Sequence, residues 1–252
     1  MISKNKIKFL QSLSFKKNRE KYQQATLEGF RLIEEVANSE TNIEHIYCIP
    51  KMMDIVSNNN LFNAYEKTMI SEQECKAISE TKNSQGIIAL ASIEKYSSNK
   101  IDNINNENIL ILDGVSDPGN LGTIFRNCIW FGIHSIVLTE NSIDPFNLKC
   151  IRSGMGSHFY FNNIVKENSK IIIKHLKKYN YNTLVADLKG EDINNINYKN
   201  NWALVLGSEA NGISSNFEVF KKVTINKIGH IESLNVSVAS GILLNELIKN
   251  NF

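Results

Sequence analysis

The second half of the chain alternates between continuous apolar runs and amphipathic stretches, and this alternation constrains the fold most strongly. After residue 108, four runs read as buried strands: NILILDGV, SIVLTE, NTLVADL and NWALVLGSE. Between and after them, three stretches carry apolar residues at helical spacing: NLGTIFRNCIWFG, SKIIIKHLKKYN and SLNVSVASGILLNELIKN. Strands that are apolar on both faces are typical of a parallel sheet covered by helices on both sides. The sequence therefore predicts an α/β domain with a parallel sheet over residues 109–252.

The first part of the chain has a mixed pattern and is set apart by a polar, Asn-rich stretch. That stretch, IEKYSSNKIDNINNEN, predicts a linker. Before it, ATLEGFRLIEEVANS has helical spacing, whereas HIYCIP and GIIALASI read as strands. We therefore expect a smaller α/β domain over residues 1–95, a linker over 96–108 and a larger domain over 109–252. The second Asn-rich stretch, GEDINNINYKNN, predicts an exposed loop.

Composition excludes several classes of protein. Hydrophobic residues make up 42% of the chain, charged residues 21%, and no apolar run approaches the roughly 18 residues that cross a membrane. The N-terminus lacks the apolar core and cleavage site of a signal peptide, so we expect a cytoplasmic protein without membrane contact. The four cysteines have no metal-ligand spacing and suggest reduced, buried thiols: Cys48, Cys75, Cys128 and Cys150. Neither a zinc site nor a disulfide framework is expected.

Positive charge is concentrated at the N-terminal end, although the net charge of the chain is only +2. The first 31 residues contain Glu20 and Glu28 as their only acidic residues. The basic residues there are Lys4, Lys6, Lys8, Lys16, Lys17, Arg19, Lys21 and Arg31. Such a segment can follow a phosphate backbone, and it can equally be a set of solvated helix faces.

Polar loops that contain glycine follow the apolar runs, and ligands of open parallel sheets usually bind at such strand ends. The first loop, within DGVSDPGNLGTIFRN, contains Asn120 and leads to Arg126. Taken alone, Asn120 could be a helix cap and Arg126 a surface ion-pair residue. The second, within LVLGSEANGI, places Glu209 just after Gly207, and a glycine there permits a tight turn.

The third polar loop precedes the last predicted helix, within INKIGHIESLNVSVASGILLNEL. Ser233 and Asn235 both lie at the start of that helix, and either could cap it. A helix has one N-cap position, so capping does not explain both residues. Common nucleotide and hydrolase motifs are absent from the sequence: GxxxxGK[ST], a strand-linked GxGxxG, and GxSxG.

Together, the three loops resemble the SpoU family of RNA 2′-O-methyltransferases within the SPOUT superfamily. The family's three motifs correspond to NLGTIFR, LVLGSEANGI and ESLNVSVASG, in the same order, and RSGMGSHFYF resembles the segment between the first two. The N-terminal KNREKYQQATLEGFRLIEEV is similar to a ribosomal-protein-like α/β domain that binds RNA in front of the methyltransferase domain.

The resemblance implies a deep trefoil knot, an S-adenosylmethionine pocket and a homodimer whose active sites lie near the interface. It implies no metal, and an RNA substrate held by the basic N-terminal domain, most often ribosomal RNA. The positions that match the family's active site are Asn120, Arg126, Glu209, Ser233 and Asn235. The positions that match its cofactor pocket are Val185, Ala186, Gly207, Ile225 and Leu234. Three positions depart from the usual pattern: Asn226 and Lys227 replace Pro and Met, and Ala210 stands where glycine is common.

The chemistry implied is attack of a ribose 2′-hydroxyl on an activated methyl group. Arginine stays protonated in proteins, so we expect Arg126 to grip a phosphate and stabilise alkoxide charge rather than to act as a base. Four other functions remain open from the sequence: a non-catalytic RNA-binding protein, a transfer RNA 2′-O-methyltransferase, a methyltransferase acting on a base nitrogen, and an unrelated ligand-binding domain.

Overall fold

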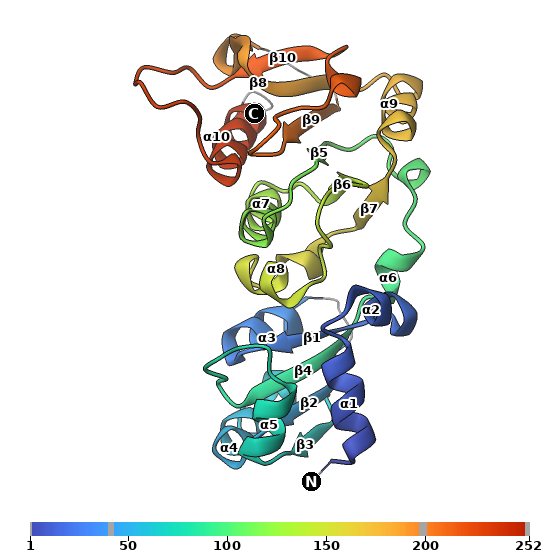
Figure 1. Ribbon diagram of the computed structural model, residues 1–252, viewed down its shortest axis with the longest axis vertical. Coiled ribbons are helices and arrows are strands. Elements are labelled where there is room, and N and C mark those ends of the chain that lie inside the picture. Colours follow the sequence, from blue (N-terminus) through green and yellow to red (C-terminus); the bar gives the residue numbers. More distant parts are fainter. Residues whose placement is uncertain (1, 40–42, 197–200, 250–252) are drawn as a thin grey trace. The chain divides into compact units, whose positions relative to one another are not determined.

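The computed structural model describes residues 2–39, 43–196 and 201–249 (Figure 1). By contacts, the chain divides into two compact units. The first consists of residues 1–98 together with 144–160, and the second of residues 99–143 together with 161–252. The sequence predicted domains over residues 1–95 and 109–252, which puts residues 144–160 in the larger domain. By contacts, these residues belong to the smaller unit.

A four-stranded sheet forms the centre of the first unit. Its strands lie in the order β1 (Gln24–Glu28), β4 (Ile87–Ser92), β2 (Ile43–Cys48), β3 (Lys67–Met69). Strand β4 pairs antiparallel with both neighbours, whereas β2 and β3 are parallel. The strands predicted from HIYCIP and GIIALASI are confirmed as β2 and β4.

The helix predicted from ATLEGFRLIEEVANS is wrong in its first part. Residues Gln24–Glu28 form β1, and helix α3 (Phe30–Ala37) begins only after Gly29. Gly29 has a φ of 105°, a conformation that favours glycine and breaks the chain direction between strand and helix. Leu27 stands at helical spacing from Phe30 but is buried in the sheet. Over so few residues, apolar periodicity alone does not separate a buried strand from a helix.

Helices surround this sheet. They are α1 (Lys4–Ser12), α2 (Lys16–Tyr22), α4 (Pro50–Ser57), α5 (Glu72–Ile78) and α6 (Glu94–Ser97), with 3-10 turns at Asn60–Phe62 and Ser157–Tyr160. Helix α1 packs against α5, and both bury apolar side chains against β2 and β4. Helix α5 starts with a capping box, in which Ser71 and Glu74 each bond the other's backbone N–H.

The segment 144–160, which includes helix α8 (Leu148–Ser153), folds into the first unit. Helix α8 packs against β1, and the Tyr160 hydroxyl donates to the Glu35 carbonyl at 3.0 Å. Gly156 lies so close to α3 that a Cβ there would stand 2.7 Å from Val36 Cγ2. The sequence pattern places this segment in the larger domain, whereas its contacts join it to the smaller one.

A six-stranded parallel sheet forms the centre of the second unit and confirms the predicted α/β class. Its strands lie in the order β10 (Lys221–Thr224), β8 (Asn182–Asp192), β9 (Trp202–Gly207), β5 (Ile109–Asp113), β6 (Ser135–Thr139), β7 (Asn163–Glu167). Figure 1 shows α7 (Pro118–Trp130) and α10 (Val236–Lys249) on one side of this sheet and α9 (Ser169–Lys178) on the other. These are the three predicted helices, although the last residue of the predicted α10, Asn250, lies outside the described residues. The trefoil knot stays a prediction.

The two Asn-rich stretches are more structured than expected. The first contains α6 and a 3-10 turn, Ile101–Asn103, and buries Tyr96 and Ile104. In the second, residues 190–192 extend β8, a 3-10 turn follows at Ile193–Asn195, and residues 197–200 lie outside the described residues. A further 3-10 turn spans Ser215–Phe217. Isoleucines buried within polar sequence explain the difference, because single apolar residues give no periodic signal.

All four cysteines are buried and carry free thiols. Among the helices that the structure describes, none has the length and hydropathy needed to cross a membrane. In the same part of the chain, His, Cys, Asp and Glu side chains form no group that could hold a metal ion.

Candidate active site

The order of the parallel strands creates a switch point between β5 and β9. From β5 the chain crosses through α7 to β6, whereas β9 lies on the other side of β5 and leads on to β10 beyond β8. The loops that leave adjacent strands in opposite directions open a crevice at the carboxyl edge of the sheet, where ligands of such folds bind. Asn120 follows β5 and Glu209 follows β9, so both lie at this point.

A chain of hydrogen bonds joins the three sequence motifs. Asn120 Nδ2 donates to Glu209 Oε1, and Asn235 Nδ2 donates to Asn120 Oδ1 at 2.9 Å. Asn235 Oδ1 in turn accepts from the Ser237 backbone N–H at 2.8 Å. Each amide is thereby fixed in one orientation, and residues 89 and 115 positions apart in the chain are held together. We refer to Asn120, Glu209 and Asn235 as the amide cluster.

The structure shows which residues cap the two helices. Asp117, not Asn120, caps α7, because Asp117 Oδ1 accepts from the Asn120 N–H at 2.8 Å. The side chain of Asn120 is therefore available to the amide cluster. At α10, Asn235 performs the capping and also belongs to the cluster. Ser233 is exposed two residues earlier, and no hydrogen bond joins it to the cluster within the described residues.

Gly207 sets the position of Glu209. A Cβ at Gly207 would stand 2.3 Å from the carbonyl carbon and oxygen of Gly212, so a side chain does not fit. The close approach belongs to a tight turn in which the N–H groups of Ser208 and Gly212 donate to each other's carbonyls at 3.1 and 2.9 Å. Glu209 lies within this turn, directed toward Asn120 by the bond described above.

Asp113, which the sequence analysis did not single out, anchors the same loop. The last residue of β5, it is buried, and its Oδ2 accepts from the Ser214 N–H at 2.7 Å. The turn that bears Glu209 is therefore tied at its far end to the strand that leads to Asn120. A carboxylate that ends an otherwise apolar strand was the available signal, since buried carboxylates need hydrogen-bond donors.

Asn127 is a second residue that the sequence analysis missed. Its Nδ2 donates at 2.9 Å to both the Ser237 carbonyl and Ser240 Oγ, and so joins α7 to α10 just behind the amide cluster. Helices α7 and α10 pack directly against each other. In the sequence, Asn127 is only a polar residue next to the apolar positions of a predicted helix, and this pattern is weak evidence for a contact with another helix.

Arg126 lies on α7 six residues after Asn120, about 9 Å along the helix axis. Its side chain is exposed, and within the part of the chain that the structure describes no hydrogen bond or ion pair holds its guanidinium. The alternative interpretation of Arg126 as a surface ion-pair residue therefore finds no support there. A guanidinium without a protein partner can bind an incoming phosphate or oxyanion.

Of the predicted cofactor residues, two lie at strand ends: Gly207 ends β9 and Ile225 follows β10. Val185 lies within β8, and Leu234 precedes α10. Val185 is buried in β8, where it pairs with Val205 of β9 and Lys222 of β10, and the half-buried Ala186 follows it. Ile225 comes directly after β10 and is half-buried, whereas Leu234 is exposed.

An ion pair joins β8 and β10. Lys222 Nζ lies 2.8 Å from Asp187 Oδ2, and the hydrogen bond from Lys222 holds the pKa of Asp187 below its usual range. The pair links β10, three residues before Ile225, with the β8 segment that carries Ala186.

Comparison with known proteins decides the family. The model of the SpoU rRNA Methylase family matches residues 107–245, which is more than half of the chain and includes the whole amide cluster. The chain belongs to the SpoU rRNA methylase family. The model of the MRM3-like substrate binding domain matches residues 4–89 of this SpoU protein.

Relatives of the SpoU protein match it over most of its length. It is 31% identical over 249 residues to the 23S rRNA (guanosine(2553)-2′-O)-methyltransferase RlmP of Bacillus subtilis, covering 96% of this chain and 95% of the relative. It is 28% identical over 177 residues to the 23S rRNA (guanosine-2′-O-)-methyltransferase RlmB of Neisseria meningitidis, covering 68% and 71%. The crystal structure of an AdoMet-bound rRNA methyltransferase from Sinorhizobium meliloti matches with a TM-score of 0.85 and 25% identity, covering 100% and 97%.

The double role of Asn235 leads to a prediction. Aspartate caps a helix as well as asparagine does, but it cannot donate to Asn120. For Asn235→Asp we therefore expect a free energy of unfolding, measured with urea, within about 0.5 kcal/mol of that of the unsubstituted protein. Methyl transfer to RNA should fall by up to about tenfold, because loss of one hydrogen bond between neutral groups costs about 0.5–1.5 kcal/mol. The control is Asn168→Asp, at the N-cap of α9, where activity should not change. Equal activity in the two variants would contradict a role for the amide cluster.

Proposed function

We propose that this chain transfers the methyl group of S-adenosylmethionine to a ribose 2′-hydroxyl of ribosomal RNA of the 23S type. The observation that carries the proposal is the amide cluster, which joins the three family motifs at the switch point of a parallel sheet. The names of the Bacillus and Neisseria relatives support this reaction and this RNA.

The residues at the carboxyl edge fit S-adenosylmethionine. Ile225 and Leu234 provide apolar surface for the adenine ring, and the missing side chain of Gly207 leaves backbone at the strand end. Val185 is fully buried in β8 and supports this edge from within the core. When bound, S-adenosylmethionine supplies a methyl group that its sulfonium charge has already activated. Asn226 and Lys227 are both exposed, so the departures from the family pattern do not fill the apolar edge.

A ribose hydroxyl is a poor nucleophile, and residues of this chain make its attack on the methyl group easier. Arg126 grips a phosphate next to the target ribose and stabilises the negative charge that develops on its 2′-oxygen. Asn120 and Glu209 hold their loops in register, so that oxygen and methyl group meet in line. Ser233 and Asn235 complete the pocket around the ribose and the methionine part of the cofactor.

The first unit supplies affinity for RNA in this proposal. It contains the match to a substrate-binding domain, and Lys4, Lys8, Lys16, Lys17, Lys21 and Arg31 are exposed on it. Arg19 is an exception to the predicted basic surface, because only 5% of it is exposed. RNA rather than DNA is the substrate because only RNA has the acceptor hydroxyl. The proposed location is the cytoplasm, where such RNA is handled.

We also propose a homodimer that forms through α7 and α10. These packed helices expose Trp130, Val238 and Ile242, with exposed fractions of 84%, 50% and 36%, around a shallow pocket. Val238 and Ile242 are one helical turn apart, so they present one apolar stripe. A second copy of this chain is the proposed occupant, because the stripe continues from the amide cluster at the start of α10.

Trp130→Glu tests the dimer. A buried interface tryptophan typically contributes 2 kcal/mol or more to association. The dissociation constant of the dimer should therefore rise at least about 30-fold, and a larger fraction of the protein should be monomeric. Sedimentation velocity over a concentration series measures this. Ile171→Glu, on α9 and 47% exposed, is the control and should leave the association unchanged. A monomeric unchanged protein would contradict the proposal.

The experiment that tests the function is transfer of labelled methyl from S-adenosylmethionine to unmodified 23S rRNA and to a tRNA pool. Digestion to nucleosides should recover a 2′-O-methylnucleoside from the 23S rRNA alone. Label only in tRNA, or on a base, would replace the proposed substrate or acceptor. RNA binding that is indifferent to S-adenosylmethionine, without transfer, would identify a non-catalytic RNA-binding protein.

A further inference from the structure

An aromatic side chain is exposed in the turn between α1 and α2. Phe15 has 68% of its surface exposed, more than any other aromatic residue described in the first unit. Tyr22, the other exposed aromatic of this region, packs edge-on against Phe9 with ring centroids 5.1 Å apart. No such ring contact is found for Phe15 among the described residues. Burial of a phenylalanine is normally favourable, so its exposure needs another explanation.

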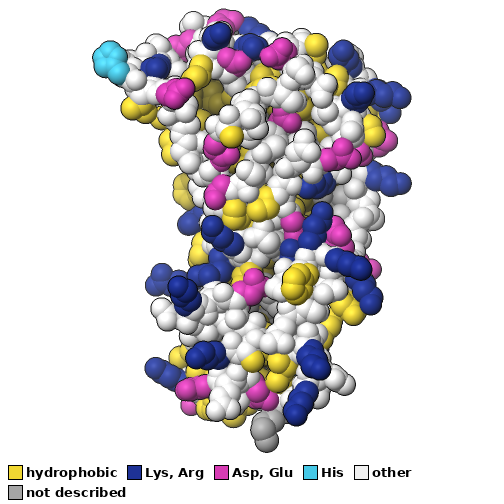
Figure 2. Space-filling view, viewed as in Figure 1, with side chains coloured by type: hydrophobic (Ala, Val, Ile, Leu, Met, Phe, Trp, Pro, Cys, Tyr) yellow, Lys and Arg dark blue, Asp and Glu magenta, His cyan; other side chains and the backbone are white. Residues whose placement is uncertain are grey.

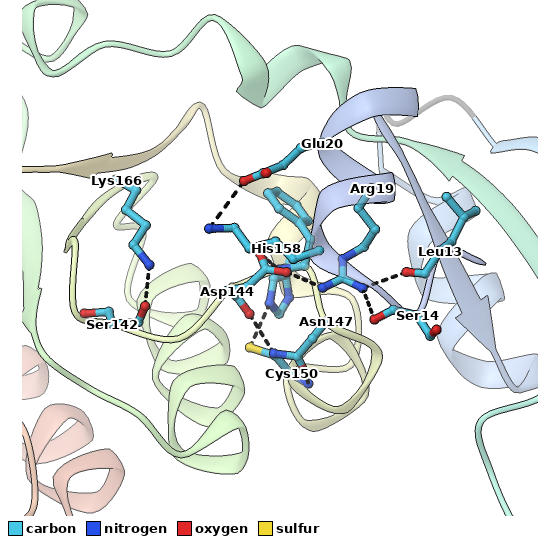
Figure 3. A network of polar contacts seen from close by, with 12 residues as sticks. Leu13, Ser14, Arg19, Glu20, Ser142, Asp144, Asn147, Cys150, His158 and Lys166 are labelled. Atoms are coloured by element: carbon cyan, nitrogen blue, oxygen red, sulfur yellow. Dashed lines mark hydrogen bonds and ion pairs between the residues drawn. The ribbon is translucent and has the colours of Figure 1, made fainter. Parts of the chain in front are cut away.

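Hydrogen bonds hold the turn that carries Phe15 in one conformation (Figure 3). Arg19 Nη1 donates to the carbonyls of Leu13 and Ser14 at 2.6 and 2.7 Å. Asn18 Nδ2 donates to the Ser12 carbonyl at 2.9 Å, and the Phe15 N–H donates to the same carbonyl at 3.1 Å. Three consecutive carbonyls before Phe15 are thus fixed.

A residue of the segment 144–160 in turn holds the side chain of Arg19 in place. Its Nη2 forms a buried ion pair with Asp144, which Figure 3 shows beside the two carbonyl bonds. A buried guanidinium with these partners makes a stiff support. The turn is therefore ordered before any ligand arrives, and ligand binding does not have to order it.

Positive charge surrounds the turn. Lys16 and Lys17 follow Phe15 directly and are exposed, and Lys21 is exposed one helical turn later. Lys16 forms a solvent-exposed pair with Glu20 at 3.3 Å, which leaves its ammonium accessible. Figure 2 shows Lys and Arg side chains along the side of the first unit that α1 and α2 form. A rigid exposed ring among lysines matches the chemistry of an unpaired nucleotide, which offers a flat base and a phosphate.

We propose that Phe15 stacks on an unpaired base of the substrate RNA, while Lys16 and Lys17 bind the neighbouring phosphates. The inference rests on the proposed function for the identity of the ligand as RNA. It adds that the RNA presents a single-stranded loop or bulge to the first unit. In an uninterrupted duplex the bases are stacked on each other, so the ring has no base to contact.

The test compares binding of two probes: a fluorescein-labelled 12-nucleotide single-stranded RNA and the same RNA annealed to its complement. Phe15→Ala should weaken binding of the single strand about 5- to 150-fold, the range of base–aromatic stacking, and leave the duplex unchanged. Phe15→Trp should restore single-strand binding, and its added indole emission should be quenched by the RNA. The control is Ile55→Ala on α4, with a similar exposed fraction of 48% and no flanking lysine pair.

In methyl transfer to 23S rRNA, Phe15→Ala should raise KM for RNA and leave kcat unchanged. Phe15→Ala and Ile55→Ala with equal affinity for the single strand would overturn the proposal. Equal loss on strand and duplex would also overturn it, as would a change of oligomeric state, which would make Phe15 a protein contact. If the unchanged chain transfers no methyl group, the proposed function fails, but the binding comparison still decides the role of Phe15.

Discussion

Replacement of Arg126 by lysine is expected to reduce methyl transfer to ribosomal RNA at least about 100-fold, the usual loss when one preorganised charge-stabilising donor is removed. Arg126 is exposed on α7, and among the described residues its guanidinium has no polar partner, so the substitution removes no structural contact there. Lysine keeps the charge but cannot form the planar two-pronged contact with a phosphate or an alkoxide. If activity is lost although the charge is kept, then methyl transfer depends on the planar geometry of the guanidinium and not only on its charge.

Single-turnover transfer with saturating RNA and cofactor measures this loss, and calorimetry with S-adenosylmethionine checks that cofactor binding persists. Arg152→Lys is the matched control, because Arg152 is also an exposed helical arginine but lies on α8 in the first unit. It should retain nearly full activity. Near-normal turnover in Arg126→Lys would refute the proposed role. Such a result would favour a simple electrostatic contact with RNA.

Gly207→Ala is expected to lower the affinity for S-adenosylmethionine at least about tenfold and the stability by about 1–3 kcal/mol. The added Cβ would stand 2.3 Å from the Gly212 carbonyl group and 2.6 Å from the Ile213 nitrogen. These are backbone atoms, which cannot rotate away as a flexible side chain can. The turn must therefore open, and Glu209 moves away from Asn120, while the end of β9 shifts at the cofactor edge.

Calorimetric titration with S-adenosylmethionine and urea unfolding separate these two effects. Gly132→Ala is the control, since Gly132 follows α7 with a φ of 72° and a Cβ there would contact nothing within 4 Å. Alanine at that φ is strained, so Gly132→Ala should lose about 1 kcal/mol of stability but bind the cofactor normally. Unchanged cofactor affinity in Gly207→Ala would mean that the Ser208–Gly212 turn does not shape the pocket.

Sequence patterns predicted the second unit well, because its strands are long, apolar runs between amphipathic helices. β5, β6, β8 and β9 and the three helices lie where the runs indicated, since burial on both faces leaves a signal that few other structures produce. Strands β7 and β10 were missed, because each is short and mostly polar: only Ile164 and Val165 are buried in β7, and only Val223 in β10. The residues of β1 were assigned to a helix. They are distinguished from a helix by the positive φ of Gly29 and by pairing with β4, and an apolar pattern reports neither of these.

The candidate site was predictable through motifs and not through physical reasoning on single residues. Asn120 was equally consistent with a helix cap until the structure placed Asp117 in that position. The supports Asp113 and Asn127 were missed because their partners are about 100 residues away in the chain. Arg19 was counted with the basic residues that either follow a phosphate backbone or form solvated helix faces, because a lysine-rich neighbourhood gives no sign of a buried partner such as Asp144. The assignment of the ten predicted site residues to catalysis and cofactor binding stays a proposal.

The membership of residues 144–160 in the first unit has a consequence for biosynthesis. During translation, residues 1–98 emerge from the ribosome long before Asp144 and α8, so the early chain lacks the partner of Arg19 and the helix that packs on β1. Without Asp144, Arg19 keeps only its carbonyl partners Leu13 and Ser14, and the buried side chains of α8 do not yet pack against β1. The first unit should therefore stay incompletely folded until about 160 residues have left the exit tunnel, and a recombinant fragment that stops at the linker should aggregate or unfold readily. Expression of the RNA-binding module by itself requires the distant segment to be grafted back, for example as a fused peptide.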